Sequence, residues 1–424
     1  MAKIQDKILI SRELKYQEMQ FLKMSFKSVI SVKANIPGEN KQVNISYLLT
    51  NHFKKLIPLD MVLYSEYYDG YDGPYFLIGN NLEPKEVKMR LIAIEDHHEL
   101  GRFIDLDVFD GNKMISRGKM RKCFVCERDA FFCIRENRHS LEEIQKIIND
   151  KVYNYFSRVT IEIVNDSIMH ELNLHPKFGL VTPYSSGSHP DMNYELMVKA
   201  KDSILPFFKK MFSVGWSTED PQTLFASIRK IGLNAEKEMN KVTDGVNAYK
   251  GLIFNLGILV TAYSYVLYNN VSIENVFQFI KKMTSELLMD YEKPDTSFGS
   301  KAYHLYGLTG ARGEAYDGFP TVQKALDYLL DLSNESKLRT LVYLISASQD
   351  TVLLKRAGSI EDYRSVKQLF KNSLKNNLVD LEELNQLCIQ KKLSFGGSAD
   401  LLIMTLFLKK IGLKSNIHLQ DHKQ

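Results

Sequence analysis

The spacing of apolar residues changes once along this chain, near Ser140, and this change constrains the fold more than any other feature. Upstream, short runs alternate apolar and polar residues, which is typical of half-buried strands. Downstream, apolar residues recur at helical spacing, beginning with Leu141, Ile144 and Ile148. Ser140 and Glu143 form a capping box, in which both side chains satisfy backbone amides at a helix start. A chain with both patterns is predicted to fold as two different domains.

The predicted domains are residues 1–150, which are α+β, and residues 151–424, which are all-α. We place the boundary near 140–155. The first domain begins with a helix up to about residue 25, and its predicted strands cover 32–36, 61–64, 75–78, 87–95, 103–109 and 113–115. The predicted helices of the second domain lie at 191–212, 222–241, 251–269, 273–291, 321–333, 337–348, 360–375, 380–390 and 398–412.

Composition excludes several classes of protein. The 424 residues exceed one ordinary core, and 44% hydrophobic and 25% charged residues are typical of soluble globular proteins. A net charge of +4 is too small to indicate a nucleic-acid partner. Four cysteines do not make a disulfide scaffold, so we expect a reducing cytoplasm. The apolar run 251–268 is interrupted by polar residues and is predicted to be a buried helix, not a membrane anchor.

Glycine lies beside charged residues in several strings, most densely in residues 307–320, with Arg312, Glu314 and Asp317. Glycine lets the backbone approach a ligand closely, and the neighbouring amides, guanidinium and carboxylates can hold phosphates and a divalent cation. Further strings of this kind occur at 187–192, 245–251 and 395–400. We predict that they line one polyanion pocket; the alternative for 307–320 is a polar interhelical loop.

Asp105 and Asp107 lie in a predicted strand, so their side chains point to the same face. Two such carboxylates can hold one or two Mg²⁺ ions, as phosphoryl and nucleotidyl transfer requires. Glu95, predicted on the preceding strand, is a possible third ligand. The alternative is a solvated strand face.

Three of the four cysteines follow within eleven residues of one another, and His139 comes soon after. Cys123, Cys126, Cys133 and His139 can bind Zn²⁺ tetrahedrally, through three thiolates and one imidazole. Alternatively, the cysteines are reduced and packed in a core. Arginines around this segment can grip phosphates, or they can be exposed loop charges.

The run from Glu95 to Val108, then Ser116-Arg117, then the cysteine segment through His139 resembles the apo-citrate lyase phosphoribosyl-dephospho-CoA transferases. That family attaches a prosthetic group to a serine of the citrate lyase acyl carrier protein and releases diphosphate. The resemblance implies a nucleotidyltransferase-like domain. Its implied site residues are His98, Arg102, Arg117 and Arg135 for phosphate, Asp105 and Asp107 for catalysis, and Glu95, Asp105 and Asp107 for Mg²⁺. Glu99 stands where the family usually has proline.

The helical half resembles the triphosphoribosyl-dephospho-CoA synthases, from about residue 155 to 415, with motifs in the family's order. Those enzymes displace adenine from ATP and join the ribosyl carbon to 3'-dephospho-CoA. The implied substrate-binding residues are Lys177, Gly187, His189, Asn247, Lys250, Gly251, Gly310, Arg312, Gly313, Gly396, Gly397 and Ser398. The candidate catalytic carboxylates are Glu171 and Glu314, and the candidate Mg²⁺ ligands are Asp191, Glu236 and Asp400. Phe178, Thr182, Tyr249 and Phe395 depart from the family's usual residues.

These resemblances imply a cytoplasmic bifunctional transferase that makes the citrate lyase prosthetic-group precursor and attaches it to the acyl carrier protein (gamma) subunit. ATP, 3'-dephospho-CoA and that subunit are the expected partners, with Mg²⁺ and a possible structural Zn²⁺; no nucleic acid or membrane is expected. A glycosyl transfer of this kind needs a carboxylate that stabilises an oxocarbenium-like transition state, and another that deprotonates the incoming ribose hydroxyl. The alternatives are the equivalent chemistry for malonate decarboxylase, and a zinc-stabilised binding module fused to a non-catalytic helical domain.

Overall fold

The computed structural model describes residues 4–417, apart from 119, 127, 293–296, 377, 379 and 380. The described chain divides into two compact units between Phe156 and Ser157, within a single long helix, and the short segment Tyr268–Asn270 groups with the first unit. Each unit is treated separately below.

The first unit holds one four-stranded antiparallel sheet, in the order β2-β3-β1-β4. Its elements are α1 (Ile4–Lys23), β1 (Ser28–Ala34), α2 (Asn44–Leu56), β2 (Tyr64–Tyr68), β3 (Tyr75–Asn80), α3 (Pro84–His97), β4 (Ile104–Phe109) and α4 (Ala130–Arg135), with short 3-10 turns at Leu59–Met61 and Gly101–Phe103. The α+β class is therefore confirmed. A hairpin does precede α3, but its first strand is β2 at Tyr64–Tyr68, and the predicted strand 61–64 is wrong because Leu59–Met61 forms a 3-10 turn. Beyond β4, residues 113–115 form only one isolated bridge, between Phe109 and Met114.

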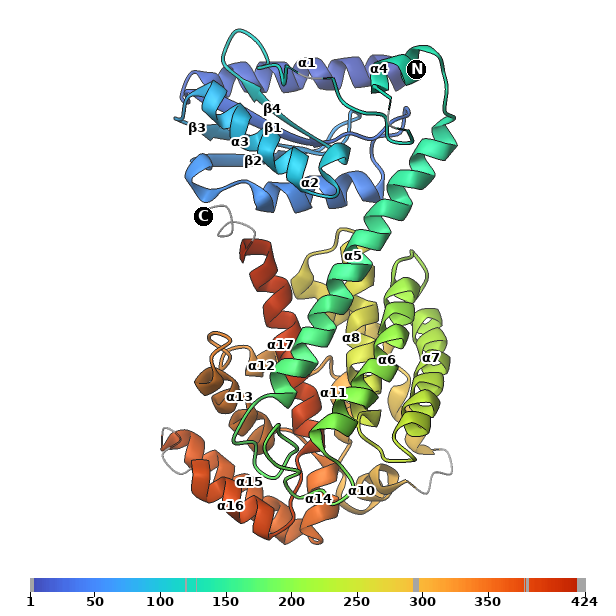
Figure 1. The fold of residues 1–424 in the computed structure, drawn as a ribbon, viewed down its shortest axis with the longest axis vertical. Helices are drawn as coiled ribbons and strands as arrows, with labels where there is room; N and C mark the ends of the chain where they lie inside the picture. Colours follow the sequence, from blue (N-terminus) through green and yellow to red (C-terminus); the bar gives the residue numbers. More distant parts are fainter. Residues whose placement is uncertain are drawn as a thin grey trace. The chain divides into compact units, whose positions relative to one another are not determined.

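Different helices lie on the two faces of the sheet (Figure 1), and alternate residues of each strand belong to opposite faces. On one face, Val29, Leu77 and Phe109 pack against Met19 and Leu22 of α1. The other face carries fully buried aliphatic side chains and is covered by α2 and α3 (Figure 1). These aliphatic residues are Ile30, Val32, Ile78, Leu106 and Val108.

The predicted strand 87–95 is wrong, because these residues form α3. The buried positions Val87, Leu91 and Glu95 are four residues apart, which is helical spacing. Pro84 stands in the first turn, where its missing N–H costs nothing. The apparent alternation in this segment came from charged residues on the exposed side of a helix.

The second unit is helical throughout the residues that the structure describes. Its elements are α5 (Leu141–Leu172, which begins in the first unit), α6 (Tyr194–Gly215), α7 (Pro221–Val242), α8 (Lys250–Tyr268), α9 (Val276–Met283), α10 (Phe298–Tyr306), α11 (Gly310–Tyr316), α12 (Pro320–Ala325), α13 (Asn334–Ala347), α14 (Thr351–Ala357), α15 (Ile360–Lys375), α16 (Leu381–Gln390) and α17 (Gly396–Ile417), with 3-10 turns at Ile273–Asn275 and Leu287–Glu292. The all-α prediction is confirmed at this level.

Several predicted boundaries in this unit are wrong. The predicted helix 273–291 is broken into two 3-10 turns and α9, and 321–333 holds only the short α12. The stretch 307–320 is not a loop throughout, because Gly310–Tyr316 forms α11. The predicted start near Ser140 is right: the Glu143 amide donates to Ser140 Oγ at 3.1 Å, directly before α5.

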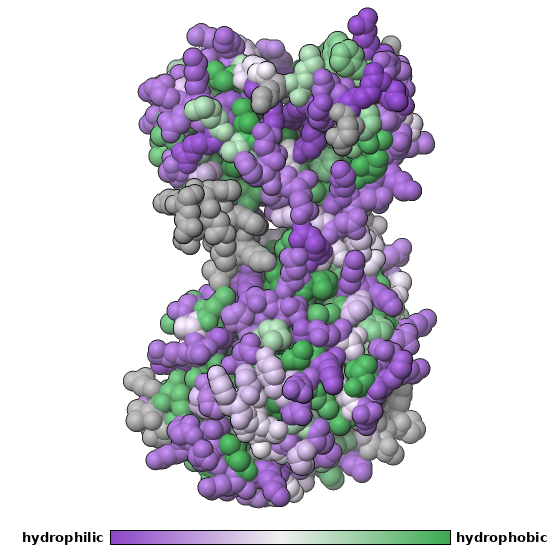
Figure 2. Space-filling view, in the orientation of Figure 1, coloured by the Kyte–Doolittle hydropathy of each residue, from purple (hydrophilic) through white to green (hydrophobic). Residues whose placement is uncertain are grey.

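Among the described residues, α8 alone is long and apolar enough to cross a membrane by length and composition. Most of its residues, Leu256 and Leu259 among them, are buried inside the fold, as expected of a core helix. The face shown in Figure 2 is mainly hydrophilic, with small scattered hydrophobic areas. The sequence-based prediction of a buried helix at 251–268 is confirmed.

Candidate active sites and metal centre

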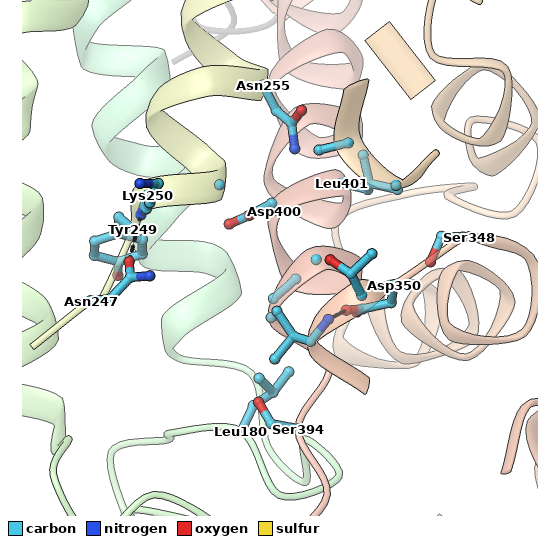
Figure 3. Close-up of a pocket in the computed structure, with 18 of the residues that line it drawn as sticks. Leu180, Asn247, Tyr249, Lys250, Asn255, Ser348, Asp350, Ser394, Asp400 and Leu401 are labelled. Carbon is cyan, nitrogen blue, oxygen red and sulfur yellow. Dashed lines mark hydrogen bonds between the residues drawn. The ribbon is translucent and has the colours of Figure 1, made fainter. Parts of the chain in front are cut away.

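A cavity of about 410 Å³ lies in the helical unit. It is lined by the C-terminal end of α5 and by the first turns of α8, α11, α14 and α17. Segments far apart in the sequence therefore meet here (Figure 3). The predicted site residues that line it are Glu171, Lys177, His189, Asn247, Lys250, Gly251, Gly310, Glu314, Gly396, Gly397 and Asp400.

Glu171 and Lys177 form a buried ion pair in the wall of this cavity. Their charged groups are 2.8 Å apart, and their side chains are only 4% and 2% exposed. The Lys177 ammonium also donates to the Glu171 carbonyl at 3.1 Å. Burial lowers the pKa of Lys177, while Glu171 opposes this shift. The predicted phosphate-binding role of Lys177 thus competes with its contacts to Glu171, and these contacts fix the position of both side chains.

Asp350 joins the first turns of two helices. Its Oδ1 accepts from the amides of Val352 and Leu353 in α14, and its Oδ2 accepts from the Ser398 amide and hydroxyl in α17, at 2.8–3.2 Å. A Cβ at Gly397 would lie 2.9 Å from Oδ1, so glycine allows this close approach. Burial raises the pKa of Asp350 despite these bonds. Ser398, predicted to bind substrate, is therefore a structural partner of Asp350.

Asp400 has no hydrogen-bond or ion-pair partner among the described residues. It points from α17 toward the start of α8 (Figure 3). A methyl group at Gly251 would overlap its Oδ2, so any larger residue there would displace the Asp400 carboxylate. Burial, followed by the charges of Asp350 and Glu171, raises the pKa of Asp400 well above its usual range. This part of the cavity has an excess of negative charge that a divalent cation would offset.

A second cavity of about 600 Å³ adjoins the first. The two share lining residues from α8, α10 and α11, including Lys250, Gly251 and Gly310. Arg229 and Arg312 line the second cavity together with a largely apolar wall. The apolar residues include Met211, Phe225, Ile228, Ile253, Phe254 and Ile258.

Three predicted residues take up defined places around these cavities. Glu314 lines the first cavity; it accepts from the Thr321 hydroxyl and amide, and burial raises its pKa. Glu236 lines the second cavity and pairs with Lys250 at 3.0 Å. Arg312 lies 4.8 Å from the centre of the Tyr291 ring.

Other predicted residues lie behind the cavity wall or outside it. Gly187 has φ +58 and no room for a Cβ against Gly179, so its role is in a tight turn. A Cβ at Gly313 would overlap the Thr309 side chain, so this glycine serves helix packing. Asp191 is exposed. His189, by contrast, does line the first cavity, and its Nε2 lies 2.9 Å from Ser394 Oγ in a buried position.

The four residues that differ from the family's usual ones have different environments in the structure. Phe178 and Phe395 are buried and pack on Phe370 with ring centres 5.0 and 5.1 Å apart. Thr182 pairs with Ser185 in a turn. Tyr249 lines the first cavity, is 3% exposed, and has a buried hydroxyl without a hydrogen-bond partner in the described chain. Only Tyr249 therefore faces the cavity.

Sequence reasoning missed Lys355 and Arg356, which line the first cavity from α14. Both are exposed, and they bring positive charge to a cavity otherwise rich in carboxylates. Helical spacing alone would not have shown which residues of this short helix face a cavity.

In the first unit, Asp105 and Asp107 of β4 project from the face that α1 covers. Their side chains are 36% and 38% exposed. Arg121 pairs with Asp105, and the Lys88 ammonium lies 3.4 Å from Asp107. Both carboxylates keep part of their surface free, so this pair fits a divalent cation.

Glu95 is buried on α3 and covers the exposed edge of β4. Its Oε1 accepts from the Leu106 amide at 2.8 Å and from Arg121 at 2.8 Å, while Oε2 accepts from Arg117 at 2.8 Å. Lys88 donates to the Leu106 carbonyl at 2.8 Å, so both edge groups of that residue are satisfied. Metal binding by Glu95, and phosphate binding by Arg117, would compete with these contacts.

The other residues predicted to bind phosphate in this unit are His98, Arg102 and Arg135, and they lie in different environments. His98 Nε2 lies 3.1 Å from both His52 Nε2 and the Tyr155 hydroxyl, in an aromatic cluster. Arg102 donates to the Lys122 carbonyl at 2.7 Å, and burial lowers its pKa to about 10. Arg135 is exposed on α4.

Cys123, Cys126, Cys133 and His139 come together, with one ligand atom from each within 4.8 Å of the others. The Sγ atoms of Cys126 and Cys133 are 3.5 Å apart, near the roughly 3.8 Å that a tetrahedral zinc centre with Zn–S bonds of about 2.3 Å implies. The Val125 amide donates to Cys123 Sγ at 3.4 Å. All four cysteines are free.

The His139 ring supports a metal more directly. Its Nε2 is buried and has no hydrogen-bond partner among the described residues. Its Nδ1 lies 3.4 Å from a Glu143 carboxylate oxygen, the arrangement in which a carboxylate orients a metal-binding imidazole. The cluster can therefore bind a metal ion, and the donor set suits zinc.

Comparison with known proteins was made for both units. Residues 158–418 match the family model described as ATP:dephospho-CoA triphosphoribosyl transferase, and residues 4–155 match that of apo-citrate lyase phosphoribosyl-dephospho-CoA transferase. The chain is 31% identical to "Protein CitXG" of Leuconostoc mesenteroides subsp. cremoris, over 95% of this chain and 96% of that protein. It is 33% identical to "Protein CitXG" of Haemophilus influenzae over 78% of each. It is 32% identical to the 2-(5''-triphosphoribosyl)-3'-dephosphocoenzyme-A synthase of Haemophilus ducreyi, over 67% of this chain and 98% of that protein.

Proposed function

The chain belongs to the ATP:dephospho-CoA triphosphoribosyl transferase family, joined to an apo-citrate lyase phosphoribosyl-dephospho-CoA transferase domain, and we propose that each reaction has its own site. The enzyme makes the citrate lyase prosthetic-group precursor from ATP and 3'-dephospho-CoA, releasing adenine, and then attaches the phosphoribosyl-dephospho-CoA group. Both family matches thus decide against a non-catalytic binding module, and the apo-citrate lyase match decides against malonate decarboxylase chemistry.

Synthesis takes place in the two adjoining cavities of the helical unit. ATP occupies the smaller one, with Lys355 and Arg356 facing its triphosphate and Asp400 holding the magnesium ion. When bound, the ion supplies positive charge that offsets the phosphate oxygens. The observation that carries this assignment is Asp400, a cavity-lining carboxylate that has no hydrogen-bond or ion-pair partner within the described part of the chain and that feels the charges of Asp350 and Glu171.

The two candidate catalytic carboxylates have different surroundings. Glu171 is fixed by its ion pair with Lys177, and a carboxylate in a fixed position suits stabilisation of positive charge at the ribosyl carbon when its bond to adenine breaks. Burial raises the pKa of Glu314, which suits acceptance of the proton from the attacking ribose hydroxyl of 3'-dephospho-CoA. These surroundings support charge stabilisation by Glu171 and general-base catalysis by Glu314, roles that the sequence left open.

3'-Dephospho-CoA occupies the larger cavity. Arg229 and Arg312 face its diphosphate, and the apolar wall receives the pantetheine arm. The shared residues around Gly251 and Gly310 mark where the two substrates meet.

The decisive experiment is incubation of the purified chain with ATP, Mg²⁺ and 3'-dephospho-CoA, followed by mass spectrometry. We expect free adenine and a heavier CoA product from the wild type, and neither from Glu314→Gln. Adenine release by a folded Glu314→Gln variant at the wild-type rate would overturn the assignment of this site.

Attachment takes place on the sheet face of the first unit, in a nucleotidyltransferase-like site. Asp105 and Asp107 hold magnesium there, and a serine of the acyl carrier protein is the acceptor. Asp107→Asn is expected to stop transfer while adenine release continues. The four free cysteines support a reducing, cytoplasmic location.

The cluster of three cysteines and His139 holds a structural zinc ion. All four ligand positions are filled by protein, which is the pattern of structural zinc sites, not catalytic ones. Elemental analysis of the purified chain is expected to give about one zinc per chain. A metal-free, folded preparation would leave a reduced cysteine cluster instead.

A further inference from the structure

Lys15 is a lysine on the face of α1 that packs on the sheet, and no sequence motif includes it. Its ammonium lies 5.3 Å from the centre of the Tyr75 ring. No hydrogen bond or ion pair to it occurs within the described parts of the chain. Lys15 is half-buried, and removing a cation from water without a partner is costly, so its position needs a reason.

Two cross-strand rows of side chains lie beneath Lys15. Lys33 of β1 is paired in register with Tyr75 on one side and Asp105 on the other. Ser31 is paired in the same way with Leu77 and Asp107, and directly opposed residues share a face of the sheet. Lys33 and Ser31 therefore lie on the same face of the sheet as both aspartates, and Lys15 lies over this face near Tyr75.

Ser31 provides a second, independent observation. It is 1% exposed, yet its hydroxyl has no hydrogen-bond partner in the described chain. Buried hydroxyls are nearly always hydrogen-bonded, and an exception calls for a ligand or another functional explanation.

The acidic residues near Lys15 already have partners. Asp72 pairs with Lys33 and with Arg12, at 3.2 Å for the latter. Asp105 pairs with Arg121, and Asp107 lies 3.4 Å from Lys88. Burial, followed by repulsion from Lys33, lowers the pKa of Lys15 to about 8, although Asp107, Asp72 and Asp105 oppose this shift. These carboxylates therefore do not fully compensate the Lys15 charge, and an anion would stabilise it further.

We propose that Lys15, Lys33 and the Ser31 hydroxyl bind the diphosphate leaving group of the transfer reaction, next to the pair Asp105 and Asp107. This inference rests on the proposed transferase function. In that reaction the carrier serine Oγ forms a bond to the α-phosphorus, and the bond between that phosphorus and the bridging oxygen to the β-phosphate breaks. The electron pair of the broken bond stays on diphosphate, and the serine proton passes to water. The Lys15 ammonium stabilises the negative charge that develops on the leaving oxygen of diphosphate.

The test compares Lys15→Met with Lys27→Met, a control at an exposed lysine that pairs with Glu83. Transfer from supplied triphosphoribosyl-dephospho-CoA to the carrier protein should fall about 10²-fold in Lys15→Met only. Adenine release should be unchanged in both. Inorganic triphosphate, without metal, should raise the Tm of the wild type and of Lys27→Met more than that of Lys15→Met.

The following results decide the inference. Wild-type transfer by Lys15→Met, or equal protection of all three proteins by triphosphate, overturns it. If Lys15→Met fails to fold by circular dichroism, Ser31→Ala takes its place, and the expected result is a several-fold loss of transfer and weaker protection. If the wild type itself does not modify the carrier, the transferase function fails, while the triphosphate measurement still judges the anion site.

Discussion

Replacing Gly251 by alanine tests the cavity of the helical unit through a single methyl group. Gly251 is the second residue of α8, and a Cβ there would overlap Oδ2 of Asp400 and lie 3.4 Å from its Cγ. Cβ contacts below 3.0 Å force a shift, so the carboxylate must move by about 1 Å to restore an ordinary contact.

The expected effect follows from this displacement. A misplacement of about 1 Å at a reacting site can cost on the order of 10² in rate. Stability should change little, within about 1 kcal/mol, because the better helix propensity of alanine offsets part of the steric cost. We therefore expect about 10²-fold slower adenine release from a folded variant.

The assay follows adenine release from ATP, Mg²⁺ and 3'-dephospho-CoA by chromatography. Gly232→Ala is the matched control, since Gly232 lines the adjoining cavity and a Cβ there has ordinary contacts of 3.7 Å or more. Transfer of supplied intermediate should remain normal in both variants. Wild-type adenine release in Gly251→Ala, or an equal loss in Gly232→Ala, would refute the role given to the position of Asp400.

Three other predictions follow from the same structure. Asp107→Asn should slow carrier modification on the order of 10²-fold and let the triphosphate intermediate accumulate. Glu314→Gln should stop adenine release and leave transfer of supplied intermediate intact. The rates of both steps, measured in both variants, check this, and loss of both steps in one folded variant contradicts two separate sites. Cys126→Ser should remove zinc, measured by elemental analysis, and lower the Tm of the first unit; retained zinc would exclude Cys126 as a ligand. The pKa of Lys15 is lowered from 10.5 to about 8, so the unfolded chain binds more protons than the folded chain between these pH values. The unfolding free energy should therefore rise with pH across this window, by at most about 3 kcal/mol relative to Lys15→Met. Denaturant unfolding of both proteins at pH 7.5 and 10.5 measures the difference, and the same pH dependence in both would show that the ammonium form of Lys15 is not destabilised in the folded state.

The sequence was most informative where one local pattern sufficed. The capping serine at Ser140 correctly predicted the start of α5, and the glycine-rich strings correctly pointed to one cavity. Gly251 and Gly397 are both needed for close approach, but to the carboxylates of Asp400 and Asp350, respectively. The glycine-rich pattern predicted where segments of the chain pack closely, but it did not predict which side chains they contact.

Other features depend on contacts that a local pattern does not contain. Val87 to Glu95 alternates well enough to resemble a strand, and only Pro84 and the four-residue spacing of its buried positions mark it as a helix. Lys15 lies on a helix with charges on several sides, so its position over Tyr75 follows only from how α1 packs on the sheet. Asp350 and Ser398 are 48 residues apart, and their hydrogen bonds exist only in the folded chain.

The buried pair of Glu171 and Lys177 also has a consequence during biosynthesis. The two residues leave the ribosome almost together, whereas Asp400 follows more than two hundred residues later. At about 5–20 residues per second, this is a delay on the order of 10 to 40 s. During that interval Lys177 is already present as a partner for Glu171, before α17 brings Asp400 to the same cavity. The ion pair therefore depends only on residues that are close together in the sequence, whereas the position of Asp400 depends on the last helix of the unit.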